Sequence, residues 1–535
     1  MAAENNHADV LVVGGGIYGL SAGAAFARRG YEVYVLDQQE RLHSDPDREA
    51  DLIPASFGRA RLIRRTAFEG DVFADMSKYT IDRFNQIQRE TGIPLITDLR
   101  TLFIVDKPSK AYEGLTGYAK DRGVSFRELD FREVENEYSW GVPSEPSHPG
   151  YYNWGPPHWI GTRPERLVRP PRRPGLRLTA DQVGIEELDS AAFNIYALLD
   201  ILDSEICLKD ENLNRKRGQV LFDTHVTGWE SNANGVSATT NRGTFTADKL
   251  ILATGGWTPE VLRSGRGEGV DRNATELMCR GMTHENVDVF YFPYPEGMPR
   301  ASIFEFAANG SVVDNNATIS NTALDSRSPN GRREFWCVPE LLPAGSRLYN
   351  GTVLQKDTLT LKLGLYYNPK DDGRDIQTRI DDAIDYMSFV FGGGLEEPID
   401  TKRCTVARRI ESERPLVGLH PGPDNVGLIV LGAYSAGRYG YVLGEELCAI
   451  MHGEQTRFDL HQLSPQDWLD RLVGSERAHG GIGLTEEPRV ERKAERPSIM
   501  YGGPVTMDDI SGGCPAGGTG RGNRNIRHGS TPYMP

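Results

Sequence analysis

The stretch Ala8–Asp37, ADVLVVGGGIYGLSAGAAFARRGYEVYVLD, decides the fold of this chain. It opens with the apolar, β-branched run Val10–Val13, which predicts a buried parallel strand. A glycine-rich turn follows, and a helix of small residues over Leu20–Arg29 ends before Gly30, a residue that suits a helix C-terminus. A second strand, Glu32–Leu36, completes a strand–helix–strand unit.

The turn Gly14-Gly15-Gly16-Ile17-Tyr18-Gly19 fits the G-x-G-x-x-G pattern of dinucleotide-binding domains. Gly14 permits the tight turn, Gly16 lets the backbone approach a pyrophosphate, and Gly19 lets the helix pack on the strand. The helix N-terminus offers N–H groups to the phosphates. Asp37, followed by Gln38, ends the second strand and can accept hydrogen bonds from ribose hydroxyls. Because so few residues precede the motif, we expect FAD rather than a nicotinamide cofactor.

Composition limits the classes of function that remain. The chain has 535 residues, which suggests two domains with appendages, and its formal net charge is −15. Such an acidic chain is unsuited to nucleic acid or an anionic membrane, because both need a basic face. No window approaches the roughly 20 apolar residues of a membrane span, and the first residues are polar, so we expect a cytoplasmic protein.

Six cysteines are scattered along the chain without a C-x-x-C pair: Cys207, Cys279, Cys337, Cys404, Cys448 and Cys514. This spacing disfavours a zinc site and a disulfide framework. We therefore expect no metal, and any special cysteine acts alone.

Two later segments repeat the strand-to-glycine-turn pattern. The strand Lys249–Ala253 runs into Thr254-Gly255-Gly256-Trp257, and the strand Gly427–Gly432 precedes Tyr434–Gly440 and a helix over Val442–Met451. A glycine turn before a helix is suited to anions. We expect FAD contacts from these two segments at Thr254, Gly255, Trp257, Gly432, Ser435, Gly437, Arg438, Tyr439 and Gly440, and also from Ser56 and Val226 elsewhere in the chain.

The order of expected strands and helices along the chain predicts an α/β fold, with a Rossmann-like FAD-binding domain and a second, mostly antiparallel-sheet substrate domain. Residues 1–75, 180–260 and 401–470 would form a discontinuous FAD domain. Residues 76–179 and 261–400 would form the substrate domain, including an aromatic insertion at Trp140–Arg173. Residues 471–535 form a Gly/Pro-rich tail that we expect to be outside any domain.

A basic cluster follows the second strand, in Ala55–Arg65. On residue type alone it is either a solvated basic face or an anion site, for which arginine's planar fork suits a carboxylate.

Three pieces of the chain together resemble the D-amino-acid-oxidase-like superfamily, and its monomeric sarcosine oxidase and fructosyl-amine oxidase branch in particular. They are Arg61-Leu62-Ile63-Arg64, Lys362-Leu363-Gly364 and Cys404, and the resemblance covers roughly residues 8–470. It implies that Arg61 lies by the flavin and that Arg64 holds a substrate carboxylate. It also implies that Lys362 promotes the reaction with oxygen, and that Cys404 links covalently to the flavin.

Two of these residues, Lys362 and Cys404, also have a plainer interpretation. Lys362 could lie on the solvent face of a strand, although burial of an unpartnered lysine is costly. Cys404 could be a small buried hydrophobe, although the neighbouring Lys402 and Arg403 would favour the thiolate.

The sequence departs from the branch in its last loop, which normally reads G-x-S-G-H-x-x-K. Here the histidine is missing and the position of the lysine, a second carboxylate anchor, falls on a glycine; Arg438 or Tyr441 is the candidate replacement. The position four after Lys362 is Tyr366 rather than histidine. These changes argue against sarcosine itself as the substrate.

The sequence thus predicts an FAD-dependent amine oxidase that acts on an amino acid or on a secondary or cyclic amine bearing a carboxylate. Hydride would pass to the flavin and oxygen would be reduced to hydrogen peroxide. The expected partners are this small-molecule amine and oxygen, and the expected assembly is a monomer or a simple homo-oligomer. Two alternatives remain open: a flavin-dependent monooxygenase, and a non-catalytic FAD-binding subunit of a complex.

Overall fold

The computed structural model describes residues 6–478 apart from 40–52, 55–57, 67–70, 139–175, 177, 179–180, 211–214, 217, 296–297, 299–300, 306–334, 343, 347, 349–351, 366–374, 376, 382, 385–396, 411–413 and 431–435. The elements up to Leu472 belong to one compact unit, and a second unit begins at Val473. The aromatic insertion at Trp140–Arg173 lies outside the described residues. So does most of the expected tail, although a helix, α10 (Pro465–Ala478), continues beyond its expected start.

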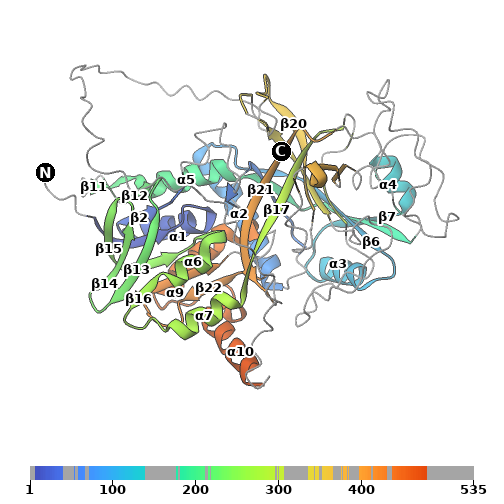
Figure 1. Cartoon of the computed structure of the whole chain (residues 1–535). Coiled ribbons are helices and arrows are strands. Elements are labelled where there is room, and N and C mark those ends of the chain that lie inside the picture. The colour runs from blue at the N-terminus through green and yellow to red at the C-terminus, as the bar shows by residue number, and fades with distance from the viewer. Residues whose placement is uncertain are drawn as a thin grey trace, which may run out of the picture. The chain divides into compact units, whose positions relative to one another are not determined.

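The first sheet contains nine strands within the described residues, and the predicted strand–helix–strand unit supplies two adjacent strands, β2 and β1, beside the edge strand β12 (Figure 1). Strand β1 pairs in parallel with β2 on one side and with β15 on the other, and β15 also pairs in parallel with β23. The carboxyl ends of these strands therefore share one edge, where ligands bind in open α/β sheets. The strands are β12 (Gly218–Leu221), β2 (Val33–Leu36), β1 (His7–Val13), β15 (Gly243–Leu252), β14 (Gly235–Thr240), β13 (Val226–Asn232), β16 (Gly265–Gly267), β22 (Leu416–Leu419) and β23 (Val426–Val430).

Helix α1 (Ile17–Arg28) contacts β1, β2 and two further helices, α5 (Ile195–Cys207) and α9 (Gly440–Met451). Small residues allow the close approach of α1 and α9, since a Cβ atom on Gly444 would lie 2.5 Å from the backbone N of Ala22. The first and last helices of the cofactor unit, α1 and α9, are thereby joined, although they lie far apart in the sequence.

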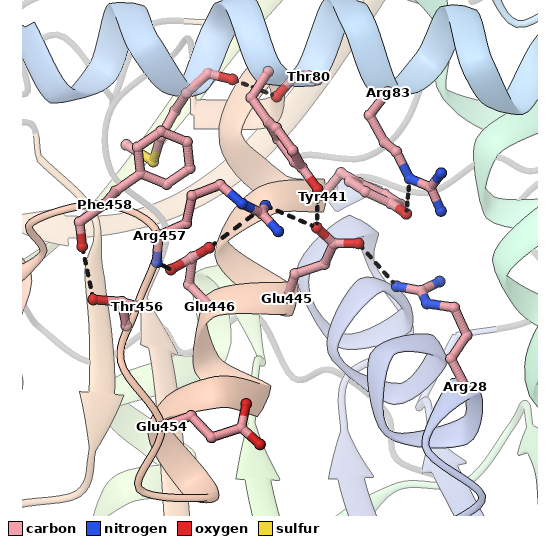
Figure 2. Close-up of polar contacts among 12 residues, drawn as sticks. Arg28, Thr80, Arg83, Tyr441, Glu445, Glu446, Glu454, Thr456, Arg457 and Phe458 are labelled. Carbon is pink, nitrogen blue, oxygen red and sulfur yellow. Dashed lines mark hydrogen bonds and ion pairs between the residues drawn. The ribbon is translucent and has the colours of Figure 1, made fainter.

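A polar network also links these helices to α2 (Asp71–Thr91). Figure 2 shows Glu445 of α9 between Arg28 of α1, at 3.2 Å, and Arg457, at 3.4 Å. In the same view Arg83 of α2 donates a hydrogen bond of 3.2 Å to the hydroxyl of Tyr441. Tyr441 therefore belongs to the packing of the helices, and the prediction that it replaces the family's carboxylate anchor is wrong.

The second sheet also has nine strands among the described residues. Its long pair β17 and β21 is antiparallel and runs through the middle of Figure 1. One face of the sheet packs the aromatic and aliphatic side chains of Phe290, Phe292, Leu361 and Leu363 into a separate core. The strands are β3 (Ile53–Pro54), β21 (Asp400–Arg409), β17 (Met282–Pro293), β20 (Thr358–Leu365), β19 (Phe335–Leu342), β18 (Ala301–Glu305), β6 (Arg100–Asp106), β8 (Gln182–Glu187) and β7 (Phe126–Leu129).

A third sheet of three strands, as far as the chain is described, links the basic cluster to the start of α5. Its strands are β4 (Ala60–Ile63), β9 (Ala191–Asn194) and β5 (Ile96–Asp98). Smaller elements complete the described chain: α3 (Lys110–Asp121), α4 (Phe131–Glu137), α6 (Thr258–Arg263), α7 (Arg272–Arg280), β10 (Lys209–Asp210), β11 (Arg215–Lys216) and three short 3-10 helices, η2 (Gly255–Trp257), η4 (Ala436–Tyr439) and η5 (His461–Leu463).

The mixed α/β architecture, with a parallel Rossmann-like core and antiparallel strands beside it, is the predicted fold class. The boundaries of the two domains stay a prediction. Three segments that we assigned to the cofactor domain, β3, β8 and β21, take their strand pairing from the second sheet. No helix among the described residues is long and apolar enough to cross a membrane.

Candidate functional site

The glycine turn after β1 has the tight geometry that its sequence predicts. Gly14 has φ +106°, and a Cβ atom there would lie 2.3 Å from the carbonyl oxygen of Ala253, which directly follows β15. Gly16 is the N-cap residue of α1 and supplies no side-chain cap. A Cβ atom on Gly19 would lie 1.8 Å from the carbonyl oxygen of Gly14. The turn is therefore pressed between a helix and a neighbouring strand, and only glycine leaves its backbone accessible.

Asp37 turns back from the end of β2 toward this glycine turn. Its carboxylate accepts hydrogen bonds from the backbone N–H groups of Gly15 and, at 2.7 Å, of Gln39. Gln38 beside it lies 2.9 Å from the ring of His225, which directly precedes Val226 at the start of β13. The acidic residue is thus held next to the N-terminus of α1, where the motif needs it.

The turn after β15 connects the first sheet to the second. Gly255 has φ +56°, and a Cβ atom at this position would meet no atom within 4 Å, so the space beside it is open. A Cβ atom on Gly256 would lie 2.2 Å from the side chain of Thr405 in β21. The Thr254–Trp257 segment therefore packs directly beside Cys404.

The segment before α9 approaches the same place from the far end of the sequence. A Cβ atom on Gly440 would lie 2.8 Å from Ile17, so the N-termini of α1 and α9 meet. A Cβ atom on Gly437 would lie 3.6 Å from Arg61. Arg438 and Tyr439 are buried, with the guanidinium carbon 4.5 Å from the centre of the tyrosine ring. Three expected contacts, Ser56, Gly432 and Ser435, lie outside the described residues, as does Tyr366.

The opposite wall of the site is one face of the second sheet. Lys362 of β20 lies opposite Tyr291 of β17 on one side and Val338 of β19 on the other. Side chains two residues apart share a face of a strand, so Glu340 is on this face too. The Lys362 Nζ atom lies 2.9 Å from the Glu340 carboxylate, and both side chains are almost fully buried. Lys362 is therefore a buried, paired cation, not the solvent-facing lysine of the plainer interpretation.

Arg61 on β4 supplies a second cation to this face. It donates hydrogen bonds to the carbonyl oxygens of Gly58, at 3.3 Å, and Ala60, at 2.9 Å. The positive charge of Arg61 repels the positive charge of Lys362. Burial lowers the pKa of Lys362 most, Glu340 raises it, and Arg61 lowers it again. The structure thus brings Arg61 and Lys362 together, and their roles beside a flavin stay a prediction.

Arg64 is also buried, but its described neighbour is different. Its guanidinium carbon lies 5.9 Å from the centre of the Phe103 ring on β6. The role of Arg64 at the site stays a prediction.

Cys404 of β21 lies among these charged groups. Burial raises the pKa of the Cys404 thiol, and the charges of Lys362 and Arg61 offset this only in part. Arg403, one of the two neighbouring cations expected to favour the thiolate, pairs instead with Asp288, at 3.1 Å, on the next strand. The cations whose charges lower the pKa of the thiol, Lys362 and Arg61, come from other strands.

Sequence reasoning missed four residues that shape this face. Glu340 and Tyr291 flank Lys362, the hydroxyl of Tyr196 accepts a hydrogen bond of 2.9 Å from the N–H of Gly58, and Gly58 itself contacts the lysine. A Cβ atom on Gly58 would lie 2.5 Å from Lys362 Nζ. The one available signal was Glu340, an acidic residue on an otherwise apolar strand (FWCVPELL).

The arrangement can hold a dinucleotide. Two helix N-termini and two glycine turns meet at the carboxyl edge of the first sheet, where backbone close to a pyrophosphate must lack Cβ atoms. This edge adjoins the face of the second sheet that carries Lys362 and Cys404, because Gly256 packs against Thr405. A long, flat, anionic cofactor with a ribose fits these residues.

Comparison with known proteins agrees with this geometry. Residues 9–154 match the family model "FAD dependent oxidoreductase". The chain is 22% identical over 466 residues to monomeric sarcosine oxidase of Bacillus sp. (strain B-0618), covering 85% of this chain and 95% of the relative. It is 20% identical to monomeric sarcosine oxidase of Arthrobacter sp. (strain TE1826), covering 84% and 94%.

Solved structures show the same fold. NikD, described as an unusual amino acid oxidase essential for nikkomycin biosynthesis, matches with a TM-score of 0.58 and 16% identity, over 86% of this chain and 98% of NikD. Glycine oxidase from Geobacillus kaustophilus matches with a TM-score of 0.55 and 12% identity, over 86% and 98%.

Proposed function

Since the chain carries a domain of the FAD dependent oxidoreductase family, we propose that the protein is an FAD-dependent amine oxidase. Its substrate would bear a carboxylate next to the oxidised C–N bond. The observation that supports this most strongly is the convergence of Arg61, Lys362 and Cys404, from three different strands, beside the turn that follows β15.

Residues of the first sheet would hold the cofactor. The turn Gly14–Gly19 and the N-terminus of α9 would bind the pyrophosphate, and Asp37 would bind the ribose. Bound FAD would accept a hydride from the substrate carbon at N5 and deliver the electrons to oxygen, giving hydrogen peroxide. The boundaries of the FAD and substrate domains given by the sequence belong to this proposal.

The chain's own cations would orient the substrate and stabilise developing charge. Arg64 would bind the substrate carboxylate through its planar fork, and Arg61 would lie beside the flavin. Lys362 would stabilise the negative charge that develops on oxygen, a preorganised electrostatic role. Arg438, which is buried before α9, is the remaining candidate for a second carboxylate anchor.

Cys404 would attach to the 8α-methyl carbon of the flavin. The thiol and the methyl carbon would each lose a proton as the S–C bond forms, and the two electrons released would pass to oxygen. Because burial raises the pKa of Cys404, the thiolate would depend on the charges of Lys362 and Arg61.

Acid precipitation tests this attachment. We expect a yellow pellet from the native protein and a colourless pellet from Cys404→Ala. Cys448→Ala is a matched control, because Cys448 is buried in α9 and should leave the pellet yellow. A colourless pellet from native protein reconstituted with FAD would contradict covalent attachment.

The function itself is tested by measuring oxygen consumption and hydrogen peroxide with a panel of N-methyl, cyclic and larger aromatic amino acids. We expect equal amounts of oxygen consumed and peroxide formed with one class of amine. Consumption of NADPH instead would support a monooxygenase. A protein that retains FAD and oxidises no amine would support the non-catalytic subunit. A cytoplasmic location and a monomer or simple homo-oligomer remain our expectations.

A further inference from the structure

The Lys362–Glu340 pair has properties that a chance contact on a protein surface lacks. The two charged atoms lie 2.9 Å apart, and the side chains are 4% and 1% exposed. A lysine at such a depth would lose its proton without a partner, because burial disfavours the charged form. The burial lowers the pKa of Lys362 from its usual value, and Glu340 is the main group that raises it again.

Glu340 is itself held in place by the backbone. Its second carboxylate oxygen accepts a hydrogen bond of 2.6 Å from the N–H of Arg59. The neighbouring Gly58 approaches so closely that its missing Cβ would lie 2.5 Å from Lys362 Nζ and 3.3 Å from the Glu340 carboxylate. The carboxylate is therefore fixed through both oxygens, and the ammonium group has little room to move.

Among the described residues, the other groups around Lys362 cannot replace Glu340. The Tyr291 ring centre lies 5.7 Å from Nζ, and burial keeps that phenol protonated by raising its pKa well above the usual value. Arg61 repels the ammonium group, and burial favours the uncharged thiol of Cys404 by raising its pKa. Once bonded to the flavin as proposed, Cys404 carries no charge either. The groups that face Lys362 from the packed elements are Glu340 of β19, Tyr291 of β17, Arg61 of β4, Cys404 of β21 and, through Gly58, Tyr196 of α5.

We propose that Glu340 is a positioning residue that keeps Lys362 protonated and fixes its ammonium group on the face of the second sheet. The inference rests on the proposed function, in which Lys362 promotes the reaction with oxygen. Arg61 and Lys362 together outweigh the single charge of Glu340, so the face stays cationic toward an anion that develops on oxygen.

The first experiment measures flavin reoxidation by oxygen as a function of pH in wild type, Glu340→Gln and Lys362→Met. Without the carboxylate, the pKa of Lys362 falls further. We expect the Glu340→Gln rate to decline at a pH at least about one unit below that of wild type, and to recover when the solution is acidified. Lys362→Met should be slow at every pH.

Glu186→Gln is the matched control. Glu186 is a buried residue of the same sheet, on β8. Its carboxylate pairs with Arg127 and accepts a hydrogen bond of 2.7 Å from the hydroxyl of Tyr138. Its loss removes a buried charge of the same kind, so general weakening of the sheet would appear in this variant too. We expect its pH profile to match wild type.

A second measurement needs neither flavin nor turnover, and it works even if Glu340→Gln folds poorly. Flavin-free protein is labelled with ¹³C at the ε-carbon of lysine, and the signal that is missing in Lys362→Met identifies Lys362. We expect a charged Lys362 near neutral pH in wild type. A neutral Lys362 would overturn the proposal.

The outcomes separate this inference from the proposed function. If Lys362→Met slows reoxidation and Glu340→Gln follows the wild-type profile, Glu340 has no positioning role and the inference is wrong, while the role of Lys362 stands. If Lys362→Met reoxidises at the wild-type rate, the oxygen role of Lys362 in the proposed function fails, and a positioning role for Glu340 fails with it.

Discussion

At the scale of single residues, the geometry of the site depends on a glycine, Gly58, that leaves room for the Lys362 side chain. Gly58 has φ +89°, and a Cβ atom there would lie 2.5 Å from Lys362 Nζ. We predict that Gly58→Ala costs about 1–3 kcal/mol of unfolding free energy through backbone strain and also displaces Lys362, which slows flavin reoxidation. Denaturant unfolding and rapid mixing with oxygen measure the two effects.

Gly30→Ala provides the matched control for this prediction. Gly30 has φ +92° at the end of α1, but a Cβ atom there would meet nothing within 4 Å. The variant should lose about 1–2 kcal/mol from the left-handed backbone alone and keep the wild-type reoxidation rate. If Gly58→Ala also reoxidised at the wild-type rate, the close contact with Lys362 would have no functional role.

The sequence predicted individual residues well where a local motif carries them. Gly14, Gly19 and Asp37 follow from a turn, a helix and a strand that adjoin in the chain. Glu340 could not be found in this way, because its partner is 22 positions away and they meet only through the register of β19 with β20. Register is fixed by packing across the sheet, which one strand does not reveal.

At the scale of elements, the contact of α1 with the turn before it holds the cofactor unit together. A Cβ atom on Gly19 would lie 1.8 Å from the Gly14 carbonyl oxygen and 3.1 Å from Val12. We predict that Gly19→Ala pushes α1 away from β1, which costs about 1–3 kcal/mol of unfolding free energy and weakens FAD binding. Unfolding curves and a titration with FAD measure both losses.

Gly114→Ala tests whether helix propensity alone explains the result. Gly114 lies inside α3, where a Cβ atom would meet nothing within 4 Å. Alanine is the better helix former, so this variant should gain up to about 1 kcal/mol and bind FAD normally. Equal stabilisation by both substitutions would rule out the packing argument.

Element boundaries show where tertiary contacts override local preference. The strand predicted over Lys249–Ala253 begins earlier in the structure, because β15 is continuous from Gly243 to Leu252. Asp248 does not interrupt it, because its side chain is exposed while both neighbouring strands pair across the region. Helix α5 begins only at Ile195, because residues 191–194 form β9 against β4 and the Asn194 side chain caps α5.

At the scale of the whole molecule, a buried histidine makes folding depend on pH. His420 is 5% exposed, its ring centre lies 5.7 Å from that of Trp229, and neither ring nitrogen has a hydrogen-bond partner among the described residues. Burial lowers the pKa of His420 from 6.5 to about 4. Between these values the unfolded chain binds a proton that the folded chain does not.

The free energy of unfolding should therefore fall as the pH drops from about 6.5 to about 4, by about 3 kcal/mol in total for this residue. His420→Phe should remove this part of the slope. Urea unfolding of both proteins at a series of pH values measures it. A difference in stability between the two proteins that stays constant with pH would contradict the prediction.

The central claim, that the chain oxidises an amine beside a carboxylate with bound FAD, is tested most directly by mixing the yellow protein anaerobically with each amine and with its carboxamide. The flavin absorbance at about 450 nm reports reduction. We predict that one class of amino acid bleaches it and that the matched carboxamide, which lacks the negative charge, bleaches it far more slowly. Equal bleaching by both would contradict recognition of a carboxylate, and bleaching by NADPH but by no amine would contradict amine oxidation.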